Sequence, residues 1–190
     1  MKTRCPWTKE DELMIQYHDT EWGVPLHDDQ KLFEFIVLDT FQAGLSWQIV
    51  LKKREHFKNA FAQFNVHRIA QFKENKIEAL LMDASIIRNK LKILATIENA
   101  KSFIKIQKEF GSFDAFIWQF VNNKPKINKW KKISDVPAFS KESDAMSKEL
   151  KKRGFKFVGT TICYAFMQAA GMVNDHLVTC FCYKKNEIKK

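Results

Sequence analysis

The sequence predicts an all-α protein, and three observations lead to this fold class. Apolar residues recur at helical spacing in most segments, alternating strand patterns are scarce, and residues that cap helices stand at the segment boundaries. The nearest candidates for strands are the runs IKIQ (104–107) and FKFVG (155–159). We expect residues 1–190 to form a single compact domain made of two closely packed helical lobes.

The first half of the chain shows one helical pattern after another. KLFEFIVLDTFQ (31–42) is interrupted at Gly44, and LSWQIVLKKREHF (45–57) resumes the pattern. Asn65 is a plausible N-cap for the next helix. The helices expected after Asn65 are VHRIAQF (66–72), NKIEALLMD (75–83) and NKLKILATIENAKSFIKIQKEF (89–110).

The second half continues the helices around one polar loop. SFDAFIWQFV (112–121) starts with Ser112 as a cap, and residues 122–140 form a polar, proline-containing loop. The last two predicted helices are SKESDAMSKELKKR (140–153), which ends at Gly154, and VGTTICYAFMQAA (158–170), which ends at Gly171.

Composition favours a reducing, cytoplasmic setting. The start of the chain, MKTRCPW, runs straight into charged residues, so we expect no signal peptide. No apolar run is long enough to cross a bilayer, and we expect no membrane partner. Four cysteines are too few for a disulfide scaffold, so spaced cysteine and histidine residues indicate metal ligands.

The formal net charge of +10 favours nucleic acid as the partner, because phosphates neutralised by lysine and arginine release counterions. The alternative is that lysine merely coats a soluble surface. Two basic clusters, at 52–54 and 151–153, sharpen the first interpretation. Each closes a predicted helix, where cations also complement the helix dipole.

A cysteine and a histidine near each end of the chain form a candidate metal site. Cys5 and His18 lie near the start, and His176 and Cys180 lie near the end. The spacing of the second pair predicts that both side chains share one face of a helix. Two thiolates and two imidazoles suit tetrahedral zinc, and with four protein ligands the metal would be structural. Cys182 is a rival ligand that would face away from this helical stripe.

Aromatic residues gather in the first quarter of the chain, at Trp7, Tyr17, Trp22, Phe41 and Trp47. A protein that holds a flipped base needs aromatic faces for stacking and polar groups to read the base edge. The tryptophans lie beside polar or glycine residues, which favours a pocket over ordinary core filling.

A carboxylate interrupts the apolar helix IVLDTFQ at Asp39. Burial of an unpaired carboxylate is costly, so Asp39 must be paired, lie at a helix end or face a cavity. The turn at Gly44 presents Leu45, which either wedges into a base stack or fills an interhelical turn. Further along, ASIIRNK (84–90) forms a turn whose free amides, with Arg88 and Lys90, can bind a phosphate.

These segments resemble the 3-methyladenine DNA glycosylase I family, bacterial enzymes of base-excision repair. The similarity runs in order from Arg4 to Cys180. The stretches that carry it are RCPW, YHDTEWGVP, QAGLSW, LKKRE, IIRNKLKI and KKRGFKFVGTTICYAFMQAAGMVNDH.

The resemblance implies an all-α helix-hairpin-helix DNA glycosylase fold, and a monomer that acts on double-stranded DNA containing an alkylated purine. It implies one structural Zn²⁺ that ties the termini together, and a base pocket near Ala165. The residues implied are Cys5, His18, His176 and Cys180 for the zinc; Trp7, Tyr17, Trp22 and Trp47 for the pocket; Gly44 and Leu45 for probing the gap left by the base; and Ile86, Ile87, Arg88, Asn89 and Lys90 for gripping the DNA backbone.

Three features depart from the family pattern. Asp39 followed by Thr40 stands where glutamate is common, and its shorter reach means that hydrogen bonds to the base edge are lost or pass through water. Ala165 lacks the hydroxyl of the frequent serine. Ser85 and Leu91 stand where glycines are frequent, so the backbone there must avoid positive φ or accept strain.

The expected reaction is hydrolysis of the N-glycosidic bond of 3-methyladenine. Methylation at N3 makes the base a cationic leaving group that needs no general acid. We expect Asp39 and Tyr17 to recognise it, Trp47 to stack on it, and water to attack C1′ with little help. No lysine is assigned as a Schiff-base nucleophile, so the enzyme is expected to be monofunctional.

Other functions compete with this one. A non-catalytic reader of alkylated DNA needs the same hairpin and pocket, and the Asp39 and Ala165 departures keep this alternative open. A zinc-stapled DNA-binding module would instead pack Trp7, Trp22 and Trp47 into its core. A redox role for Cys180-Phe181-Cys182 requires thiols that are free of metal.

Overall fold

The computed structural model describes residues 2–185. Its α-helices are α1 (Glu12–Thr20), α2 (Asp29–Gln42), α3 (Trp47–Lys52), α4 (Arg54–Ala60), α5 (Val66–Ile69), α6 (Glu74–Met82), α7 (Lys90–Phe110), α8 (Phe113–Ile117), α9 (Lys141–Lys152), α10 (Thr160–Ala169) and α11 (Phe181–Lys185). Short 3-10 turns lie at η1 (Pro6–Thr8), η2 (Ala62–Phe64), η3 (Trp118–Val121) and η4 (Ile133–Asp135).

Helix signals in the sequence place most of these elements correctly. The Asn65 side chain accepts a hydrogen bond from the Arg68 N–H at the start of α5, and Ser112 does the same for Ala115 at the start of α8. Gly171 follows α10 with a φ of 66°. A Cβ at Gly171 would collide with the backbone of Val24 and Pro25, so this turn requires glycine.

Neither of the two candidate runs forms a strand. IKIQ lies inside α7, because the apolar residues of this run continue the helical stripe of the longest helix, and FKFVG is irregular. The strands lie elsewhere, at β1 (Lys126–Ile127) and β2 (Val173–Asn174). They pair in parallel, with Lys126 opposite Val173 and Ile127 opposite Asn174. Two-residue strands carry too short a pattern for the sequence to reveal.

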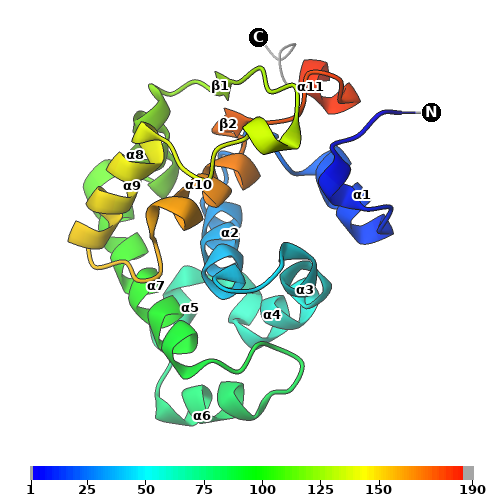
Figure 1. Cartoon of the computed structure of the whole chain (residues 1–190). Helices are drawn as coiled ribbons and strands as arrows, with labels where there is room; N and C mark the ends of the chain where they lie inside the picture. Colours follow the sequence, from blue (N-terminus) through cyan, green and yellow to red (C-terminus); the bar gives the residue numbers. More distant parts are fainter. Residues whose placement is uncertain (1, 186–190) are drawn as a thin grey trace.

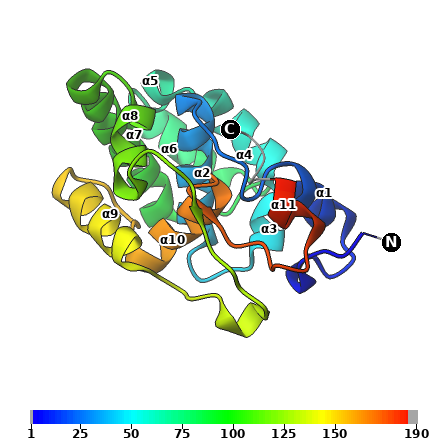
Figure 2. The same cartoon turned by 90° about the horizontal axis from the view of Figure 1, so that it is seen from above.

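Helix α2 is the centre of the molecule, and α10 packs against it (Figure 1). Residues 32–41 of α2 are all buried, and α2 also contacts α3 and α7. The two ends of the chain meet beside this core. Figures 1 and 2 both show α11 next to α1, and the Phe181 N–H donates to the Thr3 carbonyl.

None of the helices within residues 2–185 combines the length and the apolar character needed to cross a membrane.

Candidate functional sites: a terminal metal centre and an aromatic cavity

The four predicted metal ligands converge on one buried point. Cys5 precedes η1, His18 lies on α1, and His176 and Cys180 lie between β2 and α11. The predicted helix that joins His176 to Cys180 is not present. Only a single turn forms there, closed by the Cys180 N–H and the Leu177 carbonyl, and the Leu177 N–H donates to Cys5 Sγ. A loop, rather than a helix, therefore brings His176 and Cys180 to Cys5.

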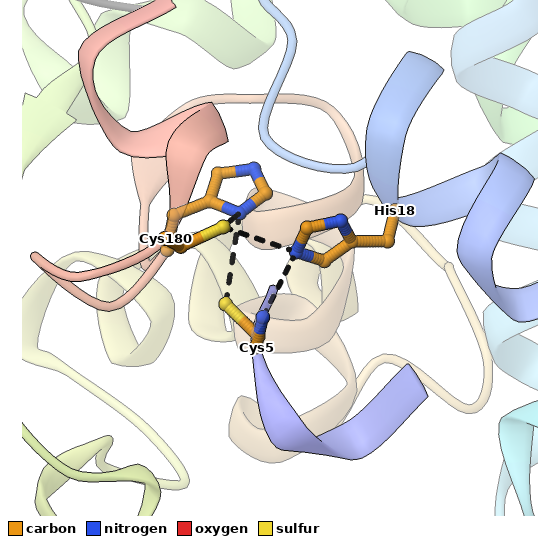
Figure 3. A group of neighbouring side chains, drawn as sticks. Cys5, His18 and Cys180 are labelled. Atoms are coloured by element: carbon orange, nitrogen blue, oxygen red, sulfur yellow. Dashed lines mark hydrogen bonds between the residues drawn. The ribbon is translucent and has the colours of Figure 1, made fainter. Parts of the chain in front are cut away.

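The spacing of the ligand atoms matches a tetrahedron. Cys180 Sγ lies 3.4 Å from His18 Nε2 and 3.6 Å from His176 Nδ1, and Cys5 Sγ lies 3.7 Å from His176 Nδ1. A zinc ion at ordinary bond lengths would separate sulfur from nitrogen by about 3.5 Å. Figure 3 shows Cys5, His18 and Cys180 turned toward one another. The four residues can therefore hold a metal ion.

Each histidine is held by its second ring nitrogen. His18 Nδ1 lies 2.8 Å from Asp19 Oδ1, and His176 Nε2 lies 3.0 Å from the Trp22 carbonyl. A neutral imidazole donates its proton to such an acceptor, which leaves the other nitrogen free to bind a metal. Arg4 Nη2 in turn donates to Asp19 Oδ2 at 2.8 Å.

Cysteine chemistry at the centre also favours a metal ligand. Hydrogen bonds from Cys182 and Cys5 lower the pKa of the Cys180 thiol well below its usual range. A thiolate is the form that binds metal. Cys182 Sγ itself lies 4.0 Å from the His18 carbonyl, and Cys182 is not one of the four convergent residues.

A cavity of about 290 Å³ lies beside the metal centre. Of the predicted residues it is lined by Trp7, Tyr17, Trp22, Asp39, Trp47 and Ala165. Its other lining residues are Met14, Gln42, Ile133, Val136, Gln168 and Ala169. This volume is close to the lower end of the usual range for small-molecule sites.

Helical spacing could have revealed some of the residues that the sequence interpretation missed. Gln42 follows Asp39 by three positions, and Gln168 and Ala169 follow Ala165 by three and four, so each shares a helix face with a predicted residue. Ile133 and Val136 come from the loop before α9, where no local pattern points to the cavity.

The aromatic rings of the cavity stand in two pairs. The Tyr17 and Trp47 ring centroids are 5.0 Å apart and tilted by 46°, and the Trp7 and Trp22 rings meet edge to face, also at 5.0 Å. Phe41, predicted with this cluster, instead lies in the core against Phe57, because it lies on another face of α2.

Asp39 faces the cavity, which is one of the three placements that the sequence left open. Its side chain is 2% exposed, and within the described chain its Oδ2 atom has no hydrogen-bond partner. Burial raises the pKa of this carboxyl well above its usual range. Burial, and next the charge of Asp39, raises the pKa of Tyr17 in the same direction. Trp47 Nε1 is a second buried polar atom without a partner in this part of the chain.

The turn after α2 and the turn before α7 are built differently. Gly44 has a φ of 80°, and Leu45 is 40% exposed and does not line the cavity.

In the turn before α7, Ile86 is buried, so its side chain holds the turn in place. Asn89 caps α7 by accepting from the Lys92 N–H. Ile87 is half-buried, Arg88 and Lys90 are exposed, and Leu91 continues into α7.

The backbone of the second turn avoids the strain considered for it. Neither Ser85 nor Leu91 is among the described non-glycine residues with positive φ.

Two lysines connect these turns. Lys92, on the first turn of α7, is buried and donates from Nζ to the carbonyls of Phe41 and Ala43 at 2.9 and 2.6 Å. Burial lowers the pKa of Lys92. Lys53 Nζ donates to the Ser85 carbonyl at 2.8 Å. The ends of α2 and α3 are thereby fixed to residues 84–92.

The arginines of the two basic clusters have partners within the protein. Arg54 bonds Glu34 at 2.6 Å and Glu21 at 2.8 Å. Arg153 bonds Glu109 at 2.6 Å and Glu149 at 2.7 Å. These guanidinium groups are therefore committed to ion pairs. In the first cluster Lys52 also lies 3.5 Å from Asp11, and Lys53 bonds the Ser85 carbonyl. In the described part of the chain, Lys151 and Lys152 are the cluster lysines with neither an ion pair nor a side-chain hydrogen bond.

The chain is similar to known proteins over nearly its full length. A family model for methyladenine glycosylase matches residues 7–183. DNA-3-methyladenine glycosylase 1 of Escherichia coli K12 is 51% identical over 184 residues, covering 97% of this chain and 98% of the relative. DNA-3-methyladenine glycosylase of Haemophilus influenzae is 49% identical over 182 residues, covering 96% and 98%.

Solved structures show the same fold. A crystal structure of 3-methyladenine DNA glycosylase I matches with a TM-score of 0.93 at 51% identity, covering 95% of this chain and 99% of the other. The Staphylococcus aureus enzyme, studied for its recognition of 3-methyladenine, matches with a TM-score of 0.91 at 35% identity, covering 94% and 95%. The chain therefore belongs to the methyladenine glycosylase family.

Proposed function

We propose that this protein is a monofunctional DNA glycosylase that hydrolyses the N-glycosidic bond of 3-methyladenine in double-stranded DNA. The observation that carries the proposal is Asp39, a buried carboxylate in an aromatic cavity whose Oδ2 has no hydrogen-bond partner among the described residues. Such a group costs free energy in the free protein unless a ligand completes it. The names of the relatives support the same activity.

The cavity supplies what a flipped, cationic base needs. Tyr17 and Trp47 offer aromatic faces for stacking, and a cation held against such faces is attracted by their negative charge density. Asp39, when ionised, accepts hydrogen bonds and opposes the positive charge of the base. Trp7 and Trp22 close the other side of the cavity, and Ala165 leaves its wall apolar.

The chemistry demands little further assistance. Because the methylated base already carries positive charge, the bond from C1′ to nitrogen breaks as the base leaves neutral, and water adds to C1′ and gives up a proton. The negative field of Asp39 acts on the developing charge at the sugar. The residues that line this cavity include no lysine. The proposed reaction is therefore hydrolysis by water, without a Schiff-base intermediate.

DNA would be gripped by the turns that Lys53 and Lys92 hold together. We assign residues 86–90 to the DNA backbone, with exposed Arg88 and Lys90 and the free amides at the start of α7 as phosphate ligands. Gly44 and exposed Leu45 are assigned to the gap left by the extruded nucleotide. The link through Lys92 would keep the two contacts in register.

The metal is assigned as one structural zinc. Cys5, His18, His176 and Cys180 supply four ligands, which leaves no open position for a reacting water. The ion, when bound, would contribute folding free energy by joining the two ends of the chain.

The direct test is release of free 3-methyladenine from methylated duplex DNA, followed by chromatography of the released base. We expect release by the wild-type protein, and no strand cleavage without added base. Intact DNA after prolonged incubation would contradict the enzyme and favour a non-catalytic reader, provided that the protein still binds methylated DNA more tightly than undamaged DNA.

The remaining alternatives lose support from the geometry. A DNA-binding module without a base pocket requires Trp7, Trp22 and Trp47 in the core, whereas all three line the cavity. A redox pair requires Cys180 to be free, whereas it lies among the four convergent residues.

A further inference from the structure

The loop before α9 carries a dense group of positive charges. Residues 124–135 contain five lysines and one aspartate, and all five lysines are exposed. Lys126 forms an ion pair with Glu142 at 2.7 Å. Lys129, Lys131 and Lys132, which we call the loop lysines, have no ion-pair partner in the described part of the chain. The carboxylate of Asp135 accepts the backbone N–H of Lys132 at 3.1 Å.

This loop is anchored to the buried part of the protein. Asn128 Nδ2 and Trp130 Nε1 both donate to Oδ1 of buried Asp175 at 2.7 Å, and the Val178 N–H donates to the Trp130 carbonyl at 3.0 Å. The pairing of β1 with β2 fixes the preceding residues. Because Trp130 is held in this way, Lys129 and Lys131 on either side of it project from a fixed backbone. Binding a partner would therefore cost these lysines less conformational entropy than lysines on a free loop.

The same loop forms a wall of the cavity. Ile133 and Val136 line it, and Ile133 is 47% exposed, so this part of the wall reaches the surface. In Figure 2, η4 and the turn between α2 and α3, which contains Leu45, both protrude at the bottom of the view. The loop lysines therefore precede a cavity wall on the side of the molecule that also presents Leu45.

We propose that the loop lysines form a second DNA-phosphate contact, separate from residues 84–90 and next to the cavity. DNA that places a nucleotide in the cavity must pass its backbone over the adjoining rim, and three unpaired ammonium groups there match that polyanion. The choice of DNA as the partner rests on the proposed function.

The test compares the salt dependence of binding to a short undamaged duplex for two matched triple variants. One replaces Lys129, Lys131 and Lys132 by glutamine. The control replaces exposed Lys105, Lys108 and Lys148 by glutamine as well. These lysines belong to α7 and α9, which lie at the left of Figure 1. Each phosphate contact contributes about 0.9 to the slope of log K against log salt. We expect the loop variant to lose about 2 to 3 from the magnitude of this slope and the control to keep it.

A slope equal to that of the wild type in the loop variant would overturn the proposal, as would an equal loss in both triple variants, which would indicate a general lysine coat. Replacement of the loop lysines by arginine should preserve the slope, which separates charge from misfolding. The outcome is independent of catalysis: a protein that releases no 3-methyladenine would refute the proposed function, while the slope would still report on the loop lysines.

Discussion

The metal centre and the aromatic cavity both bury polar groups, but they satisfy them in opposite ways. At the metal centre the second nitrogen of each histidine has an acceptor, Asp19 for His18 and the Trp22 carbonyl for His176. In the cavity, Asp39 Oδ2 and Trp47 Nε1 have none among the described residues. At the first site the protein itself orients the candidate ligands, whereas in the second no described residue bonds these two polar atoms.

From this difference we infer that the first site maintains the fold and the second performs the proposed reaction. Protein groups orient the metal ligands in advance, as expected of a structural site. The cavity keeps a costly carboxylate, as expected where stability is sacrificed for binding. Trp22 connects the two sites, because its carbonyl accepts from His176 and its ring lines the cavity.

The largest effect is expected from breaking the metal centre. Cys180→Ala removes one of four ligands, so the protein should lose bound zinc and at least about 4 kcal/mol of unfolding free energy. Metal analysis and urea unfolding measure both quantities. The matched control is Cys163→Ala, which removes a buried thiol outside the metal centre and should retain the metal. Stoichiometric zinc in Cys180→Ala would refute the ligand assignment.

A charge change in the cavity should separate function from stability. Asp39→Asn should lower the rate of 3-methyladenine release about 100-fold or more, because it removes the charge that opposes the cationic base. Its unfolding free energy at neutral pH should not fall, since a buried charge is relieved.

The control for this variant is Thr40→Val, which removes the neighbouring buried hydroxyl, also without a partner among the described residues. It should leave base release intact, because Thr40 does not line the cavity. Equal release by wild type and Asp39→Asn would remove Asp39 from the mechanism.

A smaller effect is expected from the residue that orients His18. Asp19→Ala should weaken zinc affinity about 10- to 100-fold. Base release by the zinc-loaded variant should stay near that of the wild type. The control Asp114→Ala breaks a similar histidine–aspartate contact, with His27 at 2.8 Å, and should leave zinc affinity unchanged because His27 is not among the four convergent residues. Competition with a chelator measures both variants, and an unchanged affinity in Asp19→Ala would argue against this orienting role.

The smallest effect concerns pH. Burial raises the pKa of Asp39 in the folded state above its value in the unfolded chain. The folded state therefore binds more protons between these two pKa values, and its stability should decrease as pH rises from about 4 through the folded pKa. Unfolding free energies measured across this range should show a contribution that Asp39→Asn lacks. Identical pH profiles for the two proteins would contradict the burial of an ionisable group.

The sequence predicted the helices well because capping residues and apolar spacing are local signals, as at Asn65 and Ser112. The resemblance to the family, rather than a local pattern, placed Asp39 and the tryptophans at one base pocket. The sequence did not predict Ile133 and Val136, or the pairing of β1 with β2, because these depend on contacts between segments far apart in the chain. It also did not predict that His176 and Cys180 lie on a loop, where the Leu177 N–H donates to Cys5, more than 170 positions away.

The measurement that tests the account most directly is the affinity of free 3-methyladenine for wild type and Asp39→Asn, read from quenching of tryptophan fluorescence and paired with unfolding free energies. If the carboxylate of Asp39 is kept in the cavity to recognise the base, the variant should bind the base at least about tenfold more weakly and be as stable as the wild type or more so. Equal affinity, or a variant that is destabilised and binds normally, would show that Asp39 serves the fold and would contradict the contrast between the two sites.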